Sequence, residues 1–327
     1  MHILITGVAG FIGSHLAKFL LKKGCKVTGC DNLKNGNLDR LSNILDDSDF
    51  RFFETDVCQF SDMESLTKNV DWICHLAGEV GVSHTSNRPA SSFKVNIRAT
   101  EVILEIDKKT GAKVLLGSTS EVYGNPVNTS EALVETQAIT LPPPVHPRWA
   151  YAASKAAAEY LASSYHHEFG VHTVICRFFN VTGAGQLPES GMVLPIFVSK
   201  AQKNKPLIIY GDGSQTRCFT YVEDAVEAIF RVMVHPENNG QIINIGSTKE
   251  ISILKLAGEV IRQLNSSSEI MYKEPKWQMN SGTKDIKRRI PNIEKLHKMT
   301  GFKPATDLHT IIDSIAKFHN STHKVGL

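Results

Sequence analysis

Tyr151 and Lys155 form the pair of side chains with the clearest chemical potential in this chain. They lie four positions apart in an alanine-rich run, Tyr-Ala-Ala-Ser-Lys-Ala-Ala-Ala-Glu, which favours a helix and places both side chains on one face. A lysine ammonium beside a phenol lowers the pKa of the phenol from about 10 toward neutrality. We therefore predict that Tyr151 acts as a general base on an alcohol.

A second polar segment, Gly117–Gly124, follows a short apolar run and supplies further catalytic candidates. Thr119 offers a hydroxyl to hold the same alcohol oxygen, and Ser120 lies next to it. Glu121 comes two positions after Thr119, and the period of two in an extended segment puts both on one side. A Tyr-x-x-x-Lys pair alone is usually a surface pair, and a strand-end glutamate is often only part of a salt bridge. The combination of these segments favours a catalytic site.

A glycine-rich turn near the N-terminus predicts a dinucleotide site. The segment Gly7-Val-Ala-Gly10-Phe11-Ile12-Gly13 lies between a predicted strand and a predicted helix, so its glycines allow a tight turn and close approach of a pyrophosphate. The N-terminus of that helix offers N–H groups and a positive dipole end to phosphates. Asp31, at the end of the next strand, is suited to accept both hydroxyls of an adenosine ribose, which predicts NAD rather than NADP.

Further cofactor contacts are expected where the second, third and fourth strands end. These candidates are Asn32, Asp56, Val57, Leu76, Ala77 and Gly78. An ordinary turn explains Asp56 and Val57 nearly as well as contact with adenine. The small residues after the fourth strand also suit plain packing. Tyr151 and Lys155 belong with the cofactor contacts too, because a nicotinamide cation nearby also lowers the pKa of a phenol.

Short apolar runs alternate with longer amphipathic ones, which is typical of a parallel sheet covered by helices. The predicted strands are His2–Thr6, Lys26–Cys30, Arg51–Thr55, Asp71–His75, Lys113–Gly117 and Val171–Phe178. The predicted helices are Ser14–Lys23, Ser92–Lys109, the segment that carries Tyr151, Ile253–Leu264 and Leu308–Phe318. The fold class is therefore α/β, a Rossmann-type doubly wound parallel sheet with a smaller C-terminal lobe. The polar, proline-rich stretch 125–148 is predicted to be a lid or binding loop.

Composition excludes several other classes of protein. A net charge of +3, from 36 basic and 33 acidic residues, is too balanced to indicate a nucleic-acid surface. Apolar runs such as Leu16–Leu21 are too short to span a bilayer, and the N-terminus shows no export signal. The six cysteines lack a Cys-x-x-Cys pair, which indicates reduced thiols in a cytoplasm. No histidines have metal-ligand spacing, so we predict no metal site.

These motifs and their order resemble the extended short-chain dehydrogenase/reductase family of nucleotide-sugar epimerases, dehydratases and decarboxylases. The resemblance runs from Met1 to about Pro304 and implies NAD as the cofactor and a nucleoside-diphosphate sugar, with UDP favoured, as the substrate. The residues that it assigns to NAD and to the catalytic triad are Gly7, Gly10, Gly13, Asp31, Thr119, Tyr151 and Lys155. It also implies a homodimer through a four-helix bundle of Ser92–Lys109 and Tyr151–His167.

The resemblance further implies residues for the sugar nucleotide. It places Arg177–Asn180 at the substrate, with Asn180 near the phosphates, and Gly191–Pro195, which includes Val193, along the nucleoside. Arg217 and Arg289 would bind the diphosphate, and Arg289 is favoured over Arg288. The implied domains are an NAD-binding domain over residues 1–180, with 220–246 contributing back to it, and a substrate lobe of 181–219 and 247–327.

The chain departs from the family pattern at a few positions. Thr182 and Ala184 replace the usual tyrosine and proline, and Gly78 replaces the usual alanine or serine. The sugar would be recognised at Thr182, Ala184 and the stretch 125–148.

Members of this family are expected to oxidise a sugar carbon, usually C4, to a ketone, and to differ in the reaction of that ketone. The Ser-Thr-Ser-Glu segment resembles that of UDP-glucuronate decarboxylases and 4,6-dehydratases, which favours a dehydration or decarboxylation assisted by Glu121. Gly81-Val82 resembles stretches of epimerases instead, so a UDP-hexose 4-epimerase is the alternative. A dinucleotide-binding sensor without turnover is the non-enzymatic alternative.

Overall fold

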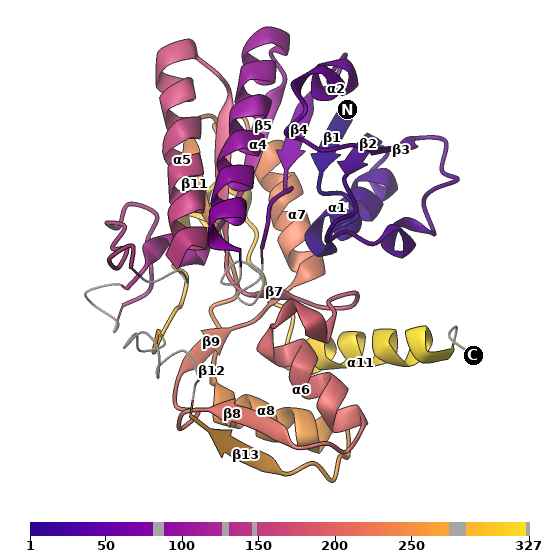
Figure 1. Ribbon diagram of the computed structural model, residues 1–327, viewed down its shortest axis with the longest axis vertical. Coiled ribbons are helices and arrows are strands. Elements are labelled where there is room, and N and C mark those ends of the chain that lie inside the picture. The colour runs from indigo at the N-terminus through magenta and orange to yellow at the C-terminus, as the bar shows by residue number, and fades with distance from the viewer. Residues whose placement is uncertain (81–87, 126–130, 146–148, 275–285, 325–327) are drawn as a thin grey trace.

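The computed structural model describes residues 1–80, 88–125, 131–145, 149–274 and 286–324 (Figure 1). Its largest sheet has seven parallel strands in the order β11-β6-β5-β4-β1-β2-β3. The strands are β1 (His2–Thr6), β2 (Lys26–Asp31), β3 (Phe50–Glu54), β4 (Trp72–His75), β5 (Lys113–Thr119), β6 (Thr173–Phe178) and β11 (Gln241–Ile245). The fold class and the six predicted strands are therefore confirmed, with ends that move by one or two residues.

The order of the strands creates the opening that a ligand needs. Strand β1 pairs with β2 on one side and with β4 on the other, so the chain reverses its direction of progress across the sheet at β1. In a doubly wound sheet, the carboxyl ends of the strands diverge at such a point and leave a crevice. Thr6 ends β1 there, directly before the glycine-rich turn.

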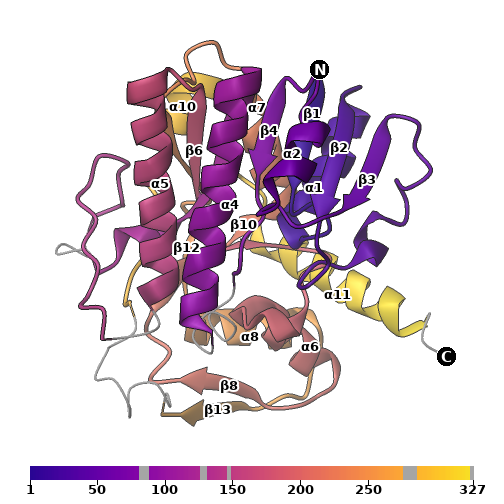
Figure 2. The ribbon, with the colours of Figure 1, turned by 45° about the horizontal axis from the view of Figure 1, so that its top comes forward.

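Helices cover both faces of this sheet. One face carries α1 (Phe11–Lys22) and α7 (Val222–Met233), with α10 (Glu294–Thr300) beyond them, and the other carries α2 (Phe60–Leu66), α4 (Pro89–Thr110) and α5 (Ala150–Phe169). Figure 2 shows α4 and α5 side by side along the sheet. Both helices end at a glycine, Gly111 and Gly170, whose backbone lies in the left-handed region. Residues with a side chain adopt this conformation only with strain.

A smaller lobe lies below the carboxyl ends of the sheet (Figure 1). It contains α6 (Val193–Gln202), α8 (Ile253–Gln263), α11 (Leu308–Lys324) and the parallel pair β8 (Leu207–Tyr210) and β13 (Ile270–Lys273). Its own apolar cluster includes Leu194, Phe197, Leu256 and Ile311. The helices predicted over Ile253–Leu264 and Leu308–Phe318 are confirmed, while the domain limits stay a prediction.

Several short elements lie outside the strands and helices predicted from the sequence. They are β7 (Val181–Thr182), β9 (Thr216–Cys218), β10 (Thr220–Tyr221), β12 (Glu250–Ser252), η1 (Leu38–Leu41), η2 (Ser120–Tyr123) and η4 (Pro188–Ser190). Runs of two to four residues carry too few positions for a periodic pattern to be recognised.

Part of the stretch predicted as a lid is anchored to the sheet side. Leu133 exchanges backbone hydrogen bonds with Ile290 (2.8 Å) and Asn292 (2.9 Å). The Glu135 carboxylate accepts a hydrogen bond from the Asn244 backbone N–H at 2.9 Å. Residues 126–130 and 146–148 of the stretch lie outside the described residues, so the lid stays a prediction. The segment Gly81-Val82, which resembles stretches of epimerases, also lies outside them.

Candidate active site

A pocket of about 610 Å³ lies at the carboxyl ends of the parallel strands. A volume of this size suits a ligand as large as a dinucleotide fragment or a drug-sized molecule. Most of the predicted site residues line it: Gly7, Gly10, Phe11, Ile12, Gly13, Asp31, Asn32, Asp56, Val57, Leu76, Ala77, Gly78, Thr119, Ser120, Glu121, Tyr151, Lys155, Asn180 and Arg289. The tertiary structure therefore brings together candidates from most of the length of the chain.

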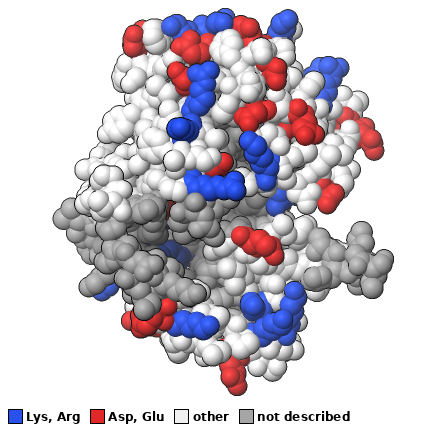
Figure 3. All heavy atoms as spheres, viewed as in Figure 1, with Lys and Arg blue, Asp and Glu red and all other residues white. Residues whose placement is uncertain are grey.

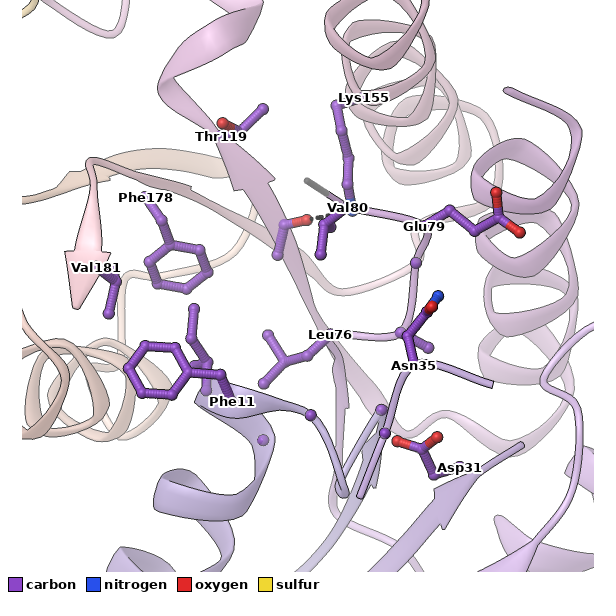
Figure 4. Close-up of a pocket in the computed structure, with 18 of the residues that line it drawn as sticks. Phe11, Asp31, Asn35, Leu76, Glu79, Val80, Thr119, Lys155, Phe178 and Val181 are labelled. Carbon is purple, nitrogen blue, oxygen red and sulfur yellow. Dashed lines mark hydrogen bonds between the residues drawn. The ribbon is translucent and has the colours of Figure 1, made fainter. Parts of the chain in front are cut away.

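Two ends of the pocket differ in the residues that line them. We call the part around Gly7–Gly13 and Asp31 the turn end, and the part around Thr119, Glu121, Tyr151 and Arg289 the tyrosine end. Figure 4 shows Asp31 at one end and Thr119 with Lys155 at the other, and Leu76 lies between them.

The glycines of the turn end are required by close backbone packing. A Cβ on Gly13 would lie 2.2 Å from the Gly7 carbonyl oxygen, and one on Gly10 would lie 2.9 Å from the same oxygen. Gly7 has φ +73°, and its Cβ would lie 2.8 Å from the Ala77 nitrogen. No side chain caps the N-terminus of α1 at Gly10, so this helix end is available to an anion. The turn thus fits the pyrophosphate of a dinucleotide.

Asp31 is held by backbone N–H groups at the mouth of the turn end. Its two carboxylate oxygens accept from Ala9 N at 3.0 Å and from Leu33 N at 2.9 Å. Burial raises the pKa of Asp31, while these two hydrogen bonds and the nearby Arg40 act in the opposite direction. Gly36 packs against it, since a Cβ there would lie 2.6 Å from Asp31 Oδ1. Asp31 is therefore fixed in orientation at the position that the sequence predicted.

Asn32 and Asp56 form a second polar pair at the turn end. The Asn32 amide donates to the Asp56 carboxylate at 3.0 Å, and the Cys58 backbone N–H donates to the same carboxylate at 3.0 Å. Burial acts to raise the pKa of Asp56, but these hydrogen bonds outweigh it and the pKa is lowered. The pair thus presents a fixed negative group beside Val57.

Gly78 is explained by its neighbours rather than by a ligand. A Cβ at Gly78 would lie 2.9 Å from Asn96 Oδ1 and 3.5 Å from Lys155 Nζ. Asn96 accepts from the Glu79 backbone N–H at 2.9 Å and donates to Ser154 Oγ at 3.0 Å. The departure from alanine or serine at this position leaves room for the lysine and for this bridge between β4 and α5.

The catalytic candidates meet at the tyrosine end. The phenol of Tyr151 is hydrogen-bonded to Thr119, and Lys155 Nζ donates to the Gly117 carbonyl oxygen at 2.8 Å. Burial and the nearby Glu121 carboxylate raise the pKa of Tyr151, whereas the hydrogen bond to Thr119 lowers it. In the protein alone the pKa of Tyr151 is therefore raised, and the predicted lowering toward neutrality is wrong there. Burial lowers the pKa of Lys155 itself, to about 8.

Glu121 reaches the pocket in a different way from the one predicted. Strand β5 ends at Thr119, and Glu121 lies in the short helix η2, so the period of two does not apply. Thr119 caps η2, because its hydroxyl accepts from the Glu121 backbone N–H at 3.2 Å. Glu121 Oε1 lies 3.6 Å from Arg289 Nη1, with exposed side-chain fractions of 18% and 6%. A carboxylate and a guanidinium therefore share the tyrosine end.

Some residues that the family resemblance placed at the substrate lie elsewhere. Val193 and Arg217 do not line the pocket in the described chain. Arg217 Nη1 donates to the carbonyl oxygens of Thr216 and Ile286, both at 2.8 Å. Arg177 is buried in an ion pair with Glu159. Long cationic side chains have many acceptors within reach, so a motif position alone does not fix where they point.

The pocket also has lining residues that the sequence analysis missed. They include Lys34, Gly36, Arg40, Glu79, Val95, Gln186, Leu187 and Glu189. Figure 4 shows Phe178 near Phe11, across the pocket from Glu79. Thr182 and Ala184, which were expected to read the sugar, do not line it, whereas their neighbours Gln186 and Leu187 do. Gly36 could have been found as a glycine shortly after the strand that ends at Asp31. Nothing in the sequence distinguishes the other residues.

The described residues hold no cluster of three or more histidine, cysteine, aspartate or glutamate side chains that suits a metal ion. Within the same ranges, no helix is both apolar enough and long enough to traverse a lipid bilayer. Figure 3 shows Lys and Arg interspersed with Asp and Glu on the face it presents. The predictions of no metal and no nucleic acid remain predictions.

One pocket on a doubly wound sheet thus holds a dinucleotide-type turn, a Thr–Tyr–Lys group and a charged pair. The profile of the NAD dependent epimerase/dehydratase family matches residues 3–246. The chain belongs to this family, whose members are NAD-dependent enzymes.

Named relatives and a solved structure support the same family. The chain is 36% identical to a UDP-N-acetyl-alpha-D-glucosaminuronate decarboxylase of Bacillus cytotoxicus over 306 residues, which are 92% of each chain. It is 32% identical to UDP-glucuronic acid decarboxylase 1 of Arabidopsis thaliana, over 94% of this chain and 67% of that one. It resembles the structure of a UDP-glucuronic acid 4-epimerase of Bacillus cereus in complex with UDP-glucuronic acid and NAD, with a TM-score of 0.86 and 30% identity. That match covers 98% of this chain and 100% of the other.

Proposed function

We propose that this protein is an NAD-dependent decarboxylase of a UDP-linked uronic acid. The observation that carries the proposal is the pair Glu121–Arg289, which lies in the same pocket as Thr119, Tyr151 and Lys155. Two relatives named as decarboxylases of UDP-linked uronic acids support it. A pocket built for oxidation and reduction alone has no need of a charged pair beside the tyrosine.

The turn end supplies the groups that would hold NAD. The backbone of Gly7–Gly13 and the N-terminus of α1 would bind the pyrophosphate, and Asp31 would accept the hydroxyls of the adenosine ribose. Bound NAD would accept a hydride from C4 of the sugar and return it later, and its positive charge would lower the pKa of Tyr151. Leu76 and Phe178 would border it.

Tyr151 would move the proton of the sugar hydroxyl. It takes the proton of the C4 hydroxyl while that carbon loses hydride, and returns it when the ketone is reduced. Thr119 orients the phenol through their hydrogen bond. The Lys155 ammonium, held by the Gly117 carbonyl, stabilises the phenolate electrostatically.

Glu121 and Arg289 would act on the carboxylate of the sugar. Oxidation at C4 makes this group a β-keto acid, whose C5–C6 bond breaks to release CO2 and leaves the electron pair on C5 and the C4 oxygen. Arg289 attracts the carboxylate into the pocket, and the nearby Glu121 charge favours its loss as neutral CO2. A proton from solvent then replaces it on C5.

Product masses test the proposal. The purified protein is incubated with UDP-glucuronate, UDP-N-acetylglucosaminuronate and, as the control without a carboxylate, UDP-glucose. We expect loss of the mass of CO2 from a uronate and no loss from UDP-glucose. We also expect Glu121→Gln to slow this loss by about 100-fold. Loss of the mass of water, or full decarboxylation by Glu121→Gln, would contradict the proposal.

A 4-epimerase is the second candidate, because the chain resembles the structure of a UDP-glucuronic acid 4-epimerase over nearly its whole length. An epimerase would convert the uronate into a product of unchanged mass, which chromatography against the C4 epimer detects. A protein without bound NAD and without a response in NADH absorbance to any sugar nucleotide would be the sensor instead.

A homodimer through α4 and α5 is part of the proposal. These helices lie side by side (Figures 1 and 2). Phe93 on α4 and Tyr160 on α5 are exposed, at 38% and 67% of their surface. A second copy that packs its own α4 and α5 there would bury both rings. Light scattering should give twice the mass of the chain, and Tyr160→Arg should lower it; a wild-type monomer would contradict this.

A cytoplasmic location completes the proposal. The six cysteines are free thiols, and all but Cys58 are buried. Free thiols persist in a reducing compartment. Fractionation of cells that express the protein should place it with cytoplasmic markers.

A further inference from the structure

Three successive turns of α5 contact three consecutive residues at the end of β5. Tyr151 bonds to Thr119, and Lys155 donates to the Gly117 carbonyl oxygen. One turn further along α5, the Glu159 carboxylate accepts from Ser118 Oγ at 2.5 Å. The first two contacts belong to the catalytic group. The third has no part in the proton and hydride transfers, although it fixes the strand residue between the other two.

Glu159 is itself held in a single orientation by the next strand. The Arg177 guanidinium donates to it through Nη2 at 2.7 Å and through Nε at 3.0 and 3.2 Å. The exposed fractions of the two side chains are 3% for Arg177 and 4% for Glu159. Arg177 on β6 is the register partner of Ser118 on β5. A forked guanidinium fixes both oxygens of a carboxylate, so Glu159 joins α5 to two adjacent strands.

We propose that Glu159 is a positioning residue for the reaction: it holds α5 in register with Gly117–Thr119 and places a negative charge one helical turn from Lys155. This inference rests on the proposed function, since it assigns Glu159 to the same Tyr151–Lys155 site. Glu159 does not line the pocket, so it acts through Ser118 and Lys155 and not on the substrate.

The charges around Lys155 explain why such a partner is needed. Burial lowers the pKa of Lys155 to about 8, and the Glu159 carboxylate is the group that acts against this. Other titratable or charged groups near Lys155 include Tyr151 on α5, His75 on β4, Glu79 after β4, Glu121 on η2 and Arg177 on β6. Burial and Lys155 lower the pKa of His75 to about 3, so that ring is neutral.

Removing one charge of a buried ion pair destabilises a protein, so a single Glu159→Gln variant risks failing to fold. Replacing both charges, as Glu159→Gln with Arg177→Met, leaves neither member of the Glu159–Arg177 ion pair buried alone. Ser118→Ala removes the hydrogen bond but keeps the charge, and Glu159→Asp keeps the charge with a shorter reach. Glu105→Gln is the matched control, because Glu105 on α4 also accepts from a hydroxyl, that of Tyr165, away from the pocket.

The first readout is the titration of the Lys155 side chain by NMR, in the full chain loaded with NAD and without sugar. In the double variant we expect its midpoint to fall by about 1 pH unit or more, because the Glu159 charge is removed and Arg177 is not among the groups that shift the pKa of Lys155. Ser118→Ala, Glu159→Asp and Glu105→Gln should leave the midpoint in place. An unchanged midpoint in a folded double variant would overturn the electrostatic role.

The second readout is the pH dependence of kcat with UDP-glucuronate. The alkaline limb of the double variant should move to lower pH, with kcat near neutrality lower by about 10- to 100-fold and KM changed by less than about 2-fold. Ser118→Ala and Glu159→Asp should lower kcat by about 10-fold without moving the limb. Wild-type kcat in Ser118→Ala would overturn the positioning role. A wild-type protein that turns over no UDP-sugar refutes the proposed function instead, and the NMR titration still decides the charge of Lys155.

Discussion

The two ends of the pocket are built by different means. At the turn end, the essential features belong to the backbone: close contacts at Gly7 and Gly13 and an uncapped helix N-terminus. At the tyrosine end, side chains from separate segments meet, such as Glu121 from η2 and Arg289 from the last part of the chain. The function of the turn end depends on backbone conformation, and that of the tyrosine end depends on charge and proton transfer.

This difference predicts how substitutions act. A change at the turn end should disturb folding and cofactor binding together, because the backbone cannot yield without moving β1 and α1. A change at the tyrosine end should alter a rate and leave the fold and the bound cofactor intact. Substitutions at each end test this separation, beginning with the largest expected effect.

Tyr151→Phe removes the group that we propose exchanges the proton with the sugar hydroxyl. We expect kcat to fall by at least about 1000-fold, while the phenylalanine ring still fills the place of the tyrosine ring beside Thr119. Bound NAD, measured after release from the purified protein, should equal that of the wild type. Loss of NAD in this variant would show that the two ends are not separable.

Gly13→Val should break the turn end. A Cβ there would lie 2.2 Å from the Gly7 carbonyl oxygen, so the turn must move. We expect a loss of about 2–3 kcal/mol in the free energy of unfolding and a protein without NAD. Denaturant titration and NAD content measure this.

Gly258→Ala is the control for that substitution. Gly258 lies in α8, and a Cβ there would meet nothing within 4 Å. Since alanine favours a helix over glycine, we expect about 0.5–1 kcal/mol of stabilisation and unchanged NAD content. A stable, NAD-loaded Gly13→Val protein would contradict the backbone explanation of the turn end.

Arg289→Leu removes the cation of the tyrosine end. The expected result is a fall in kcat/KM for the uronate of about 30-fold, with full NAD content, since a carboxylate or diphosphate loses a charge-assisted partner. Arg288→Leu is the neighbouring control. Arg288 pairs with Glu250 instead, at 3.0 Å. Equal losses in the two variants would contradict the assignment of Arg289.

Asp107→Asn tests stability apart from both ends. Asp107 on α4 is buried, and its Oδ2 has no hydrogen-bond partner among the described residues. Burial raises its pKa to about 7. The folded protein thus holds a proton that the unfolded chain releases near pH 4, so stability falls as the pH rises from about 4 to 7.

The expected size of this fall is up to about 4 kcal/mol, and Asp107→Asn should flatten it without changing kcat at any pH. Urea unfolding at several pH values measures the slope. A variant with the slope of the wild type would show that Asp107 does not set it.

Much of the turn end was predictable from the sequence. A strand, three spaced glycines, a helix and an aspartate after the next strand are local features, because each acts through its own backbone or its nearest neighbours in the chain. Tyr151 and Lys155 were predictable for the same reason, since one helical turn fixes their separation. The pKa of Tyr151 was not, because it depends on burial and on Glu121, which only the folded chain brings near.

The sequence by itself thus determined six strands of the main sheet, the glycine turn and the helical spacing of Tyr151 and Lys155. Only the tertiary structure decided that Arg289 points to Glu121, that Arg217 bonds to main-chain carbonyls and that Arg177 is bound by Glu159. The physical reason is range. Backbone geometry and helix periodicity act over a few residues, whereas the partner of a buried charge is chosen from every segment that the fold brings within a few ångströms.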